Sequence, residues 1–311
     1  MDSFITQSVA AVAGDTASGA VEIAEKSADL MLRIVQADQL SSLNQLREHL
    51  LEVGRALIDA HPTMAPLINL VNGLLWRLDL LTDQQDSCQA ISEVVTDFKR
   101  KLHIHEAAIA ETALRLIPED SQILTNGRST TVRAALRHAM RAGRRFSVIC
   151  AEGRPMCEGR AMAAELAASG IPVTLVIDAL AISLVEQSQL VLIGADHLGD
   201  HGLVNKVGTY GIALAASVTQ VPVYALCGSE KFLPPGYSPP AQSPWGVDQV
   251  WAEAPTAVKI TNFHFDTTPL HALAGIVTEQ GIQPTVGIEA WLAATRLHPA
   301  LQGRSLVLER S

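Results

Sequence analysis

The chain has 311 residues, of which 48% are hydrophobic and only 4% aromatic, and its formal net charge is −9. The length allows one large domain or two, and the aliphatic composition is typical of a helix-rich α/β protein. The negative charge argues against a general nucleic-acid or anionic-membrane surface, because such surfaces need a basic field.

The sequence has no pattern of a metal site, a disulfide framework or a membrane anchor. Its ten histidines lack metal-ligand spacing, and no CxxC pair occurs among its four cysteines, which are Cys88, Cys150, Cys157 and Cys227. Residues 1–15 lack the basic and apolar regions of a signal peptide, and no apolar run reaches the roughly 18 residues of a membrane span. We therefore expect a cytoplasmic protein with no metal and no cofactor.

The first 118 residues have the periodicity of helices and almost no strand signal. In the first helical stretch one face collects apolar residues, namely Val21, Ala24, Ala28, Met31 and Leu32. The same spacing predicts further helices over residues 43–60, 64–81 and 88–116. Residues 1–118 are therefore predicted to form a helical subdomain.

From residue 119 onward, short apolar runs alternate with amphipathic stretches. The apolar runs lie near residues 122–125, 145–151, 172–178, 190–196 and 222–227. This alternation predicts a parallel sheet covered by helices on both faces, within a second domain of residues 119–311. Residues 228–262 are predicted to form a long irregular segment.

The most informative stretch is GADHLGDHGLVNKVGT, residues 194–209. An apolar strand runs into Asp196, a glycine-rich loop follows, and Asn205 and Lys206 are predicted to open a helix. Open α/β sheets bind small ligands at the carboxyl ends of their strands, so these three side chains point to a site for an anionic, hydroxyl-bearing molecule. Asp196 could exchange a proton with a sugar hydroxyl. The alternative is an aspartate that only stabilises a turn.

Two further strand ends carry candidate ligand contacts. Ser129 and Thr130 begin a predicted helix, where backbone N–H groups and hydroxyls suit a phosphate, although Ser129 could equally be an ordinary N-cap. Arg154 precedes a proline and could hold a phosphate or carboxylate, or it could pair with Glu152 or Glu158 as a structural brace.

Several motifs, in order along the chain, resemble one superfamily. The segment GADHLGDHGLVNKVGTYGIALAA resembles its central signature, and SGAVEIA, HPTMAPLINL, ILTNGRSTTV, AEGRPMCEG, KFLP and TNFHFDTTPLHALAGIVTEQGI are similar to its other motifs. The superfamily contains the α, β and δ regulatory subunits of translation initiation factor 2B, ribose-1,5-bisphosphate isomerase and methylthioribose-1-phosphate isomerase. The resemblance implies an N-terminal helical subdomain, a C-terminal Rossmann-like domain, and assembly into dimers or higher oligomers.

The resemblance also implies a site and a departure from it. The isomerases act through a cysteine and an aspartate, and Asp196 matches the aspartate. Gly127 occupies the cysteine position, Asn126 that of the preceding histidine, and His61 that of an arginine, so the usual isomerase mechanism is not available. The positions that match ligand contacts of the family are Gly19, Ala20, Ser129, Thr130, Asn205, Lys206 and Lys231.

These observations support two main hypotheses. The first is a protein similar to the translation factor 2B subunits that binds a phosphorylated sugar or nucleotide, with Asp196 and Asn205 on sugar hydroxyls, and with Lys206, Lys231 and the Ser129 helix start on phosphate. Its output would be assembly or contact with a protein partner. The second is an aldose–ketose isomerase of sugar phosphates that recruits Cys150 or Cys227 as its base. A third possibility is a vestigial pocket.

Overall fold

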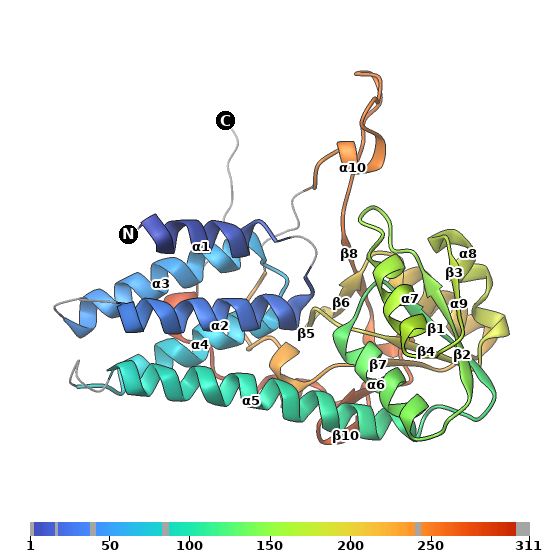
Figure 1. Cartoon of the computed structure of the whole chain (residues 1–311), viewed down its shortest axis with the longest axis horizontal. Helices are drawn as coiled ribbons and strands as arrows, with labels where there is room; N and C mark the ends of the chain where they lie inside the picture. Colours follow the sequence, from blue (N-terminus) through green and yellow to red (C-terminus); the bar gives the residue numbers. More distant parts are fainter. Residues whose placement is uncertain (1–2, 16–17, 38–41, 83–86, 240–243, 303–311) are drawn as a thin grey trace. The chain divides into compact units, whose positions relative to one another are not determined.

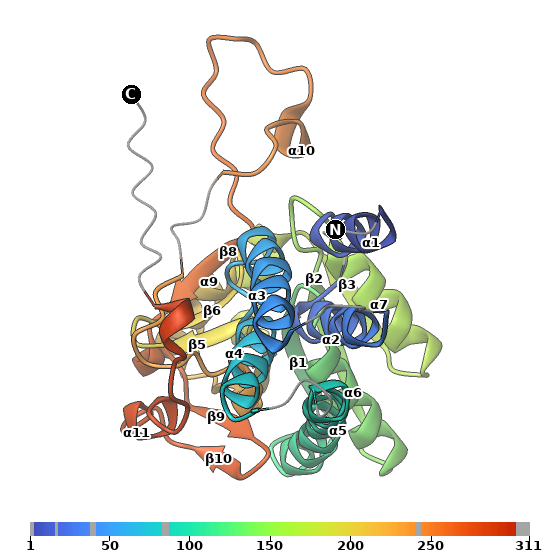
Figure 2. The ribbon, with the colours of Figure 1, turned by 90° about the vertical axis from the view of Figure 1, so that its left-hand side faces the viewer.

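A computed structural model describes residues 3–15, 18–37, 42–82, 87–239 and 244–302 of the chain (Figures 1 and 2). The chain divides into two compact units by its contacts. Unit 1 comprises residues 1–104, 230–240 and 290–311, and unit 2 comprises residues 105–229 and 241–289. The predicted boundary between a helical subdomain of residues 1–118 and a Rossmann-like domain of residues 119–311 stays a prediction.

Unit 1 is helical, as predicted for the start of the chain. Its helices are α1 (Ser3–Ala13), α2 (Ala20–Ala37), α3 (Leu43–Ala60), α4 (Ala65–Asp79) and the first part of α5 (Ser87–Leu114), and the C-terminal segment adds the short η4 (Pro299–Leu301). Ser42 caps α3 by accepting the N–H of Gln45.

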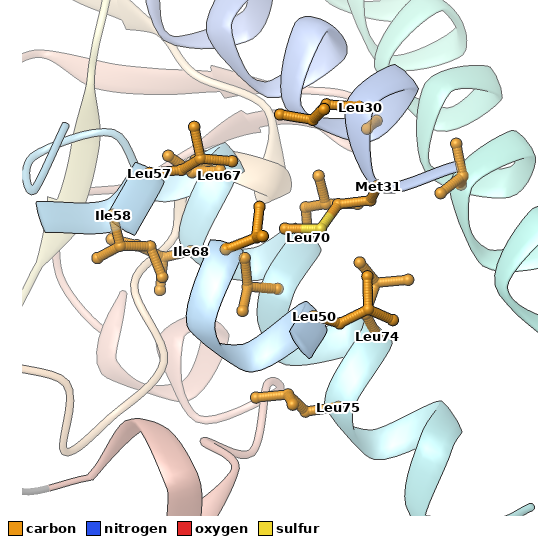
Figure 3. Close-up of a cluster of buried hydrophobic side chains, with 14 of the residues drawn as sticks. Leu30, Met31, Leu50, Leu57, Ile58, Leu67, Ile68, Leu70, Leu74 and Leu75 are labelled. Atoms are coloured by element: carbon orange, nitrogen blue, oxygen red, sulfur yellow. The ribbon is translucent and has the colours of Figure 1, made fainter. Parts of the chain in front are cut away.

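The core of unit 1 is aliphatic. Leucines from α3 and α4 interdigitate around Met31 of α2, as Figure 3 shows for Leu50, Leu57, Leu70 and their neighbours. Gly54 allows α3 and α4 to approach closely, because a Cβ there would lie 2.8 Å from Val71 Cγ1. None of the helices in the described part of the chain combines the length and hydropathy that a bilayer crossing requires.

Unit 2 is built on a seven-stranded sheet with the order β10-β9-β7-β4-β1-β2-β3. Its strands are β1 (Ser121–Asn126), β2 (Phe146–Ala151), β3 (Val173–Val176), β4 (Leu190–Ile193), β7 (Val223–Leu226), β9 (Gly275–Thr278) and β10 (Gly281–Gln283). All neighbours are parallel except β9 and β10. The predicted parallel α/β architecture is therefore confirmed.

Helices connect these strands. They are α6 (Thr130–Arg141), α7 (Glu158–Ala168), α8 (Asp178–Ser183), η1 (Val185–Gln187) and α9 (Thr209–Thr219), followed by the short α10 (Asp248–Trp251), η3 (Leu270–Ala272) and α11 (Glu289–Leu292). Helix α6 packs beside α7, and α8 packs beside α9. The chain winds from β1 outward through β2 to β3, and then returns to β4 and continues through β7 in the opposite direction. The strand order thus reverses between β1 and β4, which is the position where doubly wound sheets bind ligands.

A second, antiparallel sheet follows β4 and corrects one prediction. Its strands are β5 (His197–Gly199), β6 (Gly202–Lys206) and β8 (Phe265–Thr268), in the order β5-β6-β8. Asn205 and Lys206 therefore end a strand, and the expectation that they open a helix is wrong. Helix α9 begins only at Thr209, after Gly208 with φ +100°. Strand β6 pairs with β5 in a hairpin and with β8 about sixty residues away, and the second pairing leaves no signal in the local sequence.

The predicted irregular segment between β7 and β8 is largely confirmed. Its described residues contain only η2 (Ser229–Lys231) and α10. Figures 1 and 2 show α10 on a segment that projects away from the sheets of unit 2.

Candidate ligand-binding site

The candidate site lies where β1 and β4 end, at the reversal of strand order. Gly194 follows β4, and a Cβ on it would lie only 2.6 Å from Ser129 Oγ and 3.6 Å from Asn205 Oδ1. The loop after β1, the end of β4 and the end of β6 therefore meet at this glycine. Two of the predicted contacts, Ser129 and Asn205, are brought together here.

Asn205 is held by a buried hydrogen-bond network centred on Thr209. The Thr209 hydroxyl donates to the carbonyl oxygen of Lys206 at 2.6 Å. It accepts from the amide nitrogens of Asn126 at 3.1 Å and of Asn205 at 3.0 Å. The Asn126 amide nitrogen also donates to the carbonyl oxygens of Lys206 and Val207. The end of β1 is thus tied to the end of β6 by side chains, and both amide groups have fixed orientations.

Lys206 is buried and forms an ion pair with Glu158, the first residue of α7. Its Nζ lies 3.0 Å from Glu158 Oε1. Gly127, with φ +66°, makes room for this pair, because a Cβ there would lie 3.1 Å from Lys206 Cγ and 3.5 Å from Glu158 Oε1. The resemblance places the isomerase thiol at this glycine, and an ion pair occupies the adjacent space.

Backbone contact fixes the position of α7. A Cβ on Gly159 would lie 1.9 Å from the carbonyl oxygen of Ala151, at the end of β2. Gly159 N–H donates to the carbonyl oxygen of Glu152 at 3.0 Å. The first turn of α7, which carries Glu158, therefore packs directly on the end of β2.

His264 and Asp266, which follow the irregular segment, lie beside the end of β6. Burial, together with the charge of Lys206, lowers the pKa of His264 to about 4, so this ring is neutral near pH 7. It stacks on Trp245 with ring centroids 4.2 Å apart. Burial raises the pKa of Asp266, although its carboxylate accepts the N–H groups of Gly208 and Tyr210.

Arg154 lies in the exposed loop after β2. Its guanidinium donates to the carbonyl oxygen of Gln249 at 3.2 Å. The proposed brace to Glu152 or Glu158 is absent among the described contacts, since Glu152 pairs with Arg160 and Glu158 with Lys206.

Asp178 orients the loop that carries Arg154. Its carboxylate accepts the N–H groups of Gly153 at 2.8 Å and of Arg154 at 2.7 Å. Asp178 is the first residue of α8, so the loop after β2 is tied to the start of the helix that follows β3.

Asp196 is partly buried between β4 and β5, and its backbone N–H donates to the carbonyl oxygen of Val204 at 2.9 Å. Ser129 is the N-cap of α6 and accepts the N–H of Val132, and Thr130 begins the helix. The N-cap alternative is therefore correct for Ser129. Its hydroxyl remains partly exposed, and the ligand roles of Asp196, Ser129 and Thr130 stay predictions.

Four other residues singled out by the resemblance belong to unit 1. Gly19 donates its N–H to Glu22 Oε2 at 3.0 Å, just before α2, and Ala20 is the first residue of α2. Lys231 is buried at the end of η2, and His61 is buried with its Nε2 2.9 Å from the carbonyl oxygen of Val12. The ligand contacts predicted for Gly19, Ala20 and Lys231 stay predictions.

Both candidate thiol bases are buried. Burial raises the pKa of Cys150 to about 12, and its Sγ lies 3.3 Å from the carbonyl oxygen of Gly159. Cys227 is completely buried. A thiol with a pKa this far above 7 stays protonated at neutral pH, so Cys150 is poorly suited to act as the base in proton abstraction.

Three residues of the site, Glu158, Asn126 and Thr209, are not recognisable as functional candidates from the sequence. Glu158 lies in the segment AEGRPMCEG, and nothing in that segment indicates an ion pair with Lys206. Asn126 and Thr209 are separated by 83 residues, so no local pattern links them. The one local signal is their position: the amide of Asn126 ends an apolar strand, and the hydroxyl of Thr209 begins a helix.

Comparisons with known proteins show the family and the fold of the chain. The chain matches the model of the Initiation factor 2 subunit family over residues 16–285. A Pyrococcus horikoshii protein named translation initiation factor eIF-2B subunit 2-like is 30% identical over 268 residues, covering 85% of this chain and 90% of that protein.

Two similar relatives are named as isomerases. The methylthioribose-1-phosphate isomerase of Heliobacterium modesticaldum is 31% identical over 259 residues, covering 74% of each protein. The ribose 1,5-bisphosphate isomerase of Methanocaldococcus jannaschii is 30% identical over 261 residues, covering 81% of this chain and 82% of that protein.

Solved structures have the same fold. The crystal structure of the Pyrococcus horikoshii translation initiation factor eIF-2B aligns with a TM-score of 0.79 at 26% identity, covering 91% of this chain and 98% of that one. The tetrameric eIF2B-beta2-delta2 complex from C. thermophilum aligns with a TM-score of 0.71 at 21% identity, covering 93% of each chain. Because the family model matches most of its length, the chain belongs to the initiation factor 2 subunit family.

Proposed function

We propose that this protein binds a phosphorylated ribose-type sugar, or a nucleotide that contains one, where β1, β4 and β6 end. Asp196 and Asn205 would accept and donate hydrogen bonds to sugar hydroxyls, and the start of α6 at Ser129 would hold a phosphate. The observation that carries the proposal is the site at Gly127, which has no side chain for catalysis and lies against an ion pair.

Isothermal titration calorimetry with ribose 5-phosphate, ribose 1,5-bisphosphate, methylthioribose 1-phosphate and AMP tests this proposal. We expect at least one of them to bind, and Asp196→Asn to weaken that binding at least tenfold. Asp200→Asn is the matched control, because Asp200 is exposed at the tip of the β5–β6 hairpin. Identical binding by wild type and Asp196→Asn would refute the assignment, and an absence of heat with all four ligands would refute the proposed function.

The second candidate is an aldose–ketose isomerase of sugar phosphates. The names of two relatives at 30% and 31% identity favour it. An isomerase with this sequence would need another catalytic base, because Gly127 has no side chain and the thiol of Cys150 is buried. A coupled assay for ketose formation separates the two candidates, and turnover that survives Cys150→Ser would place the base elsewhere.

We also propose that a second copy of the chain docks on unit 2. Tyr210, Leu214 and Val218 form an exposed stripe along α9 at every fourth residue, and Val218 is 84% exposed. Four exposed apolar residues of β3 and α8 add to it, namely Leu175, Ile177, Leu180 and Ile182. The two parts are continuous, because a Cβ on Gly211 of α9 would lie 3.1 Å from Ile182 Cδ1.

The chemistry of this apolar face favours a second copy as its occupant. Helix α9 contains no charged residue, so two such faces can meet across a two-fold axis without repulsion, despite the net charge of −9. The seven exposed side chains of α9, β3, α8 and Ile177 form a contiguous apolar face, and such faces on soluble proteins mark interaction sites.

Light scattering coupled to size-exclusion chromatography tests the docking proposal. Wild type should have the mass of a dimer or larger oligomer, and the double variant Leu214→Glu, Val218→Glu should be monomeric. Leu80→Glu is the control, because Leu80 is 74% exposed in unit 1. A wild type of monomer mass, or a double variant of unchanged mass, would contradict the proposal. We also propose a cytoplasmic location, since none of the four cysteines forms a disulfide in the described part of the chain and cytosolic thiols stay reduced.

A further inference from the structure

Glu158 was not expected to contribute to the site, yet its carboxylate lies directly beside the most buried cation there. The Lys206 side chain is 7% exposed and that of Glu158 is 23% exposed, with 3.0 Å between Nζ and Oε1. A buried ammonium needs a compensating charge, and this carboxylate supplies it. The ammonium is thereby neutralised before any ligand arrives.

The other cations near the ends of β1 and β2 also have partners. Arg128 and Arg133 both pair with Glu165, and Arg160 pairs with Glu152. Arg154 in the loop after β2 instead donates to the carbonyl oxygen of Gln249, and at the end of β6 itself the described contacts pair the ammonium of Lys206 with Glu158.

Buried acceptor atoms complete this arrangement. Glu158 Oε2 and Asn126 Oδ1 are buried and have no hydrogen-bond partner among the described residues. Asn126 is only 2% exposed, and its amide nitrogen already makes three hydrogen bonds. An unpaired buried acceptor is costly, and a donor such as a hydroxyl group removes that cost. Orphaned acceptors beside a neutralised lysine suit a hydroxyl and do not suit a phosphate.

We infer that Glu158 determines the charge of the ligand group that binds beside Lys206. With this carboxylate in place, the space beside Lys206 at the end of β6 accepts a sugar hydroxyl and excludes a phosphate. The inference rests on the proposed binding function and refines it, because it removes Lys206 from the predicted phosphate contacts. The ligand class is a ribose-type sugar whose phosphate lies away from the end of β6. A sugar bisphosphate that must place one phosphate at Lys206 is disfavoured.

The test compares ribose 5-phosphate with ribose 1,5-bisphosphate by calorimetry at fixed ionic strength. Wild type should bind the bisphosphate no more than threefold more tightly than the monophosphate. Glu158→Gln has nearly the same shape and removes the negative charge, so its preference for the bisphosphate should rise at least tenfold. Adding Lys206→Gln to that variant should abolish the gain, because the released ammonium is its cause.

Glu152→Gln is the matched control. Glu152 also lies at the end of β2, but its carboxylate pairs with Arg160, so the preference should not change. If Glu158→Gln does not fold, Glu158→Asp retains the charge and draws it back from Nζ, and a smaller gain in bisphosphate preference is expected.

The possible failures are distinguishable. A wild type that binds neither sugar phosphate refutes the proposed function. If the wild type binds both sugar phosphates and Glu158→Gln leaves its preference between them unchanged, only the role of Glu158 is refuted. If Glu158→Gln is unfolded, an unchanged preference in Glu158→Asp leads to the same conclusion. A wild type that already prefers the bisphosphate more than tenfold also overturns the inference.

Discussion

Replacing Thr209 by valine tests whether its hydroxyl is the centre of the network that ties β1 to β6. Valine keeps the shape of threonine and removes only the polar atom. Thr209 is 1% exposed, so water cannot replace the lost group. The substitution removes one hydrogen bond to the Lys206 carbonyl oxygen and the acceptor of two amide groups.

The expected loss of stability follows from these contacts. The Asn126 amide nitrogen keeps two carbonyl acceptors, whereas the Asn205 amide nitrogen loses the acceptor that Thr209 supplied. A lost neutral hydrogen bond costs about 1 kcal/mol, and a buried unsatisfied amide costs about 1–3 kcal/mol. We therefore expect Thr209→Val to lower the free energy of unfolding by about 2–4 kcal/mol.

Equilibrium unfolding in urea, followed by circular dichroism, measures this change. Thr219→Val is the matched control at the other end of α9, where the hydroxyl is exposed and donates to the carbonyl oxygen of Ala215. That variant should remain within about 0.5 kcal/mol of wild type. A difference between the two variants of less than about 1 kcal/mol would refute the central role of Thr209.

Three other predictions follow from the described contacts. Burial lowers the pKa of His264 from 6.5 to about 4, so the unfolded chain takes up a proton between these values that the folded chain does not. Stability should therefore decrease as the pH falls from about 6.5 to about 4, and unfolding curves of His264→Gln should lose part of this slope. Gly194→Ala should weaken sugar-phosphate binding in calorimetry at least tenfold, because its Cβ would lie 2.6 Å from Ser129 Oγ; unchanged binding would count against the assigned site. With a thiol reagent at pH 8, exposed Cys88 should react at once and Cys150 only on unfolding; equal rates would contradict the burial that holds the pKa of Cys150 at about 12.

The alternation of apolar runs with amphipathic helices was sufficient to predict the parallel sheet. Each strand of this sheet between residues 121 and 226 is followed or preceded by its own helix, so the pattern is local and visible in the sequence. The small antiparallel sheet could not be predicted in the same way. Its central strand β6 pairs with β5 in a hairpin but also with β8, and residues 207–264 separate β6 from β8.

The site shows the same division between local and distant information. Ser129 was recognised because a hydroxyl residue at the start of a helix is a local signal. Glu158 and Lys206 are 48 positions apart, and their ion pair depends on the glycine at 127, on a third element. The sequence is sufficient to propose individual residues at strand ends as site candidates. Their interaction partners depend on how the strand ends meet in the fold, which the local sequence does not indicate.

The absence of a side chain at Gly159 restricts the substitutions that this position can accept. Because a Cβ there would lie 1.9 Å from the carbonyl oxygen of Ala151, even alanine would force the first turn of α7 away from β2. That movement would withdraw the Glu158 carboxylate and leave Lys206 as an uncompensated cation. The ligand-charge preference that we infer for the site would therefore depend partly on Gly159, a residue that has no side chain with which to contact either member of the ion pair.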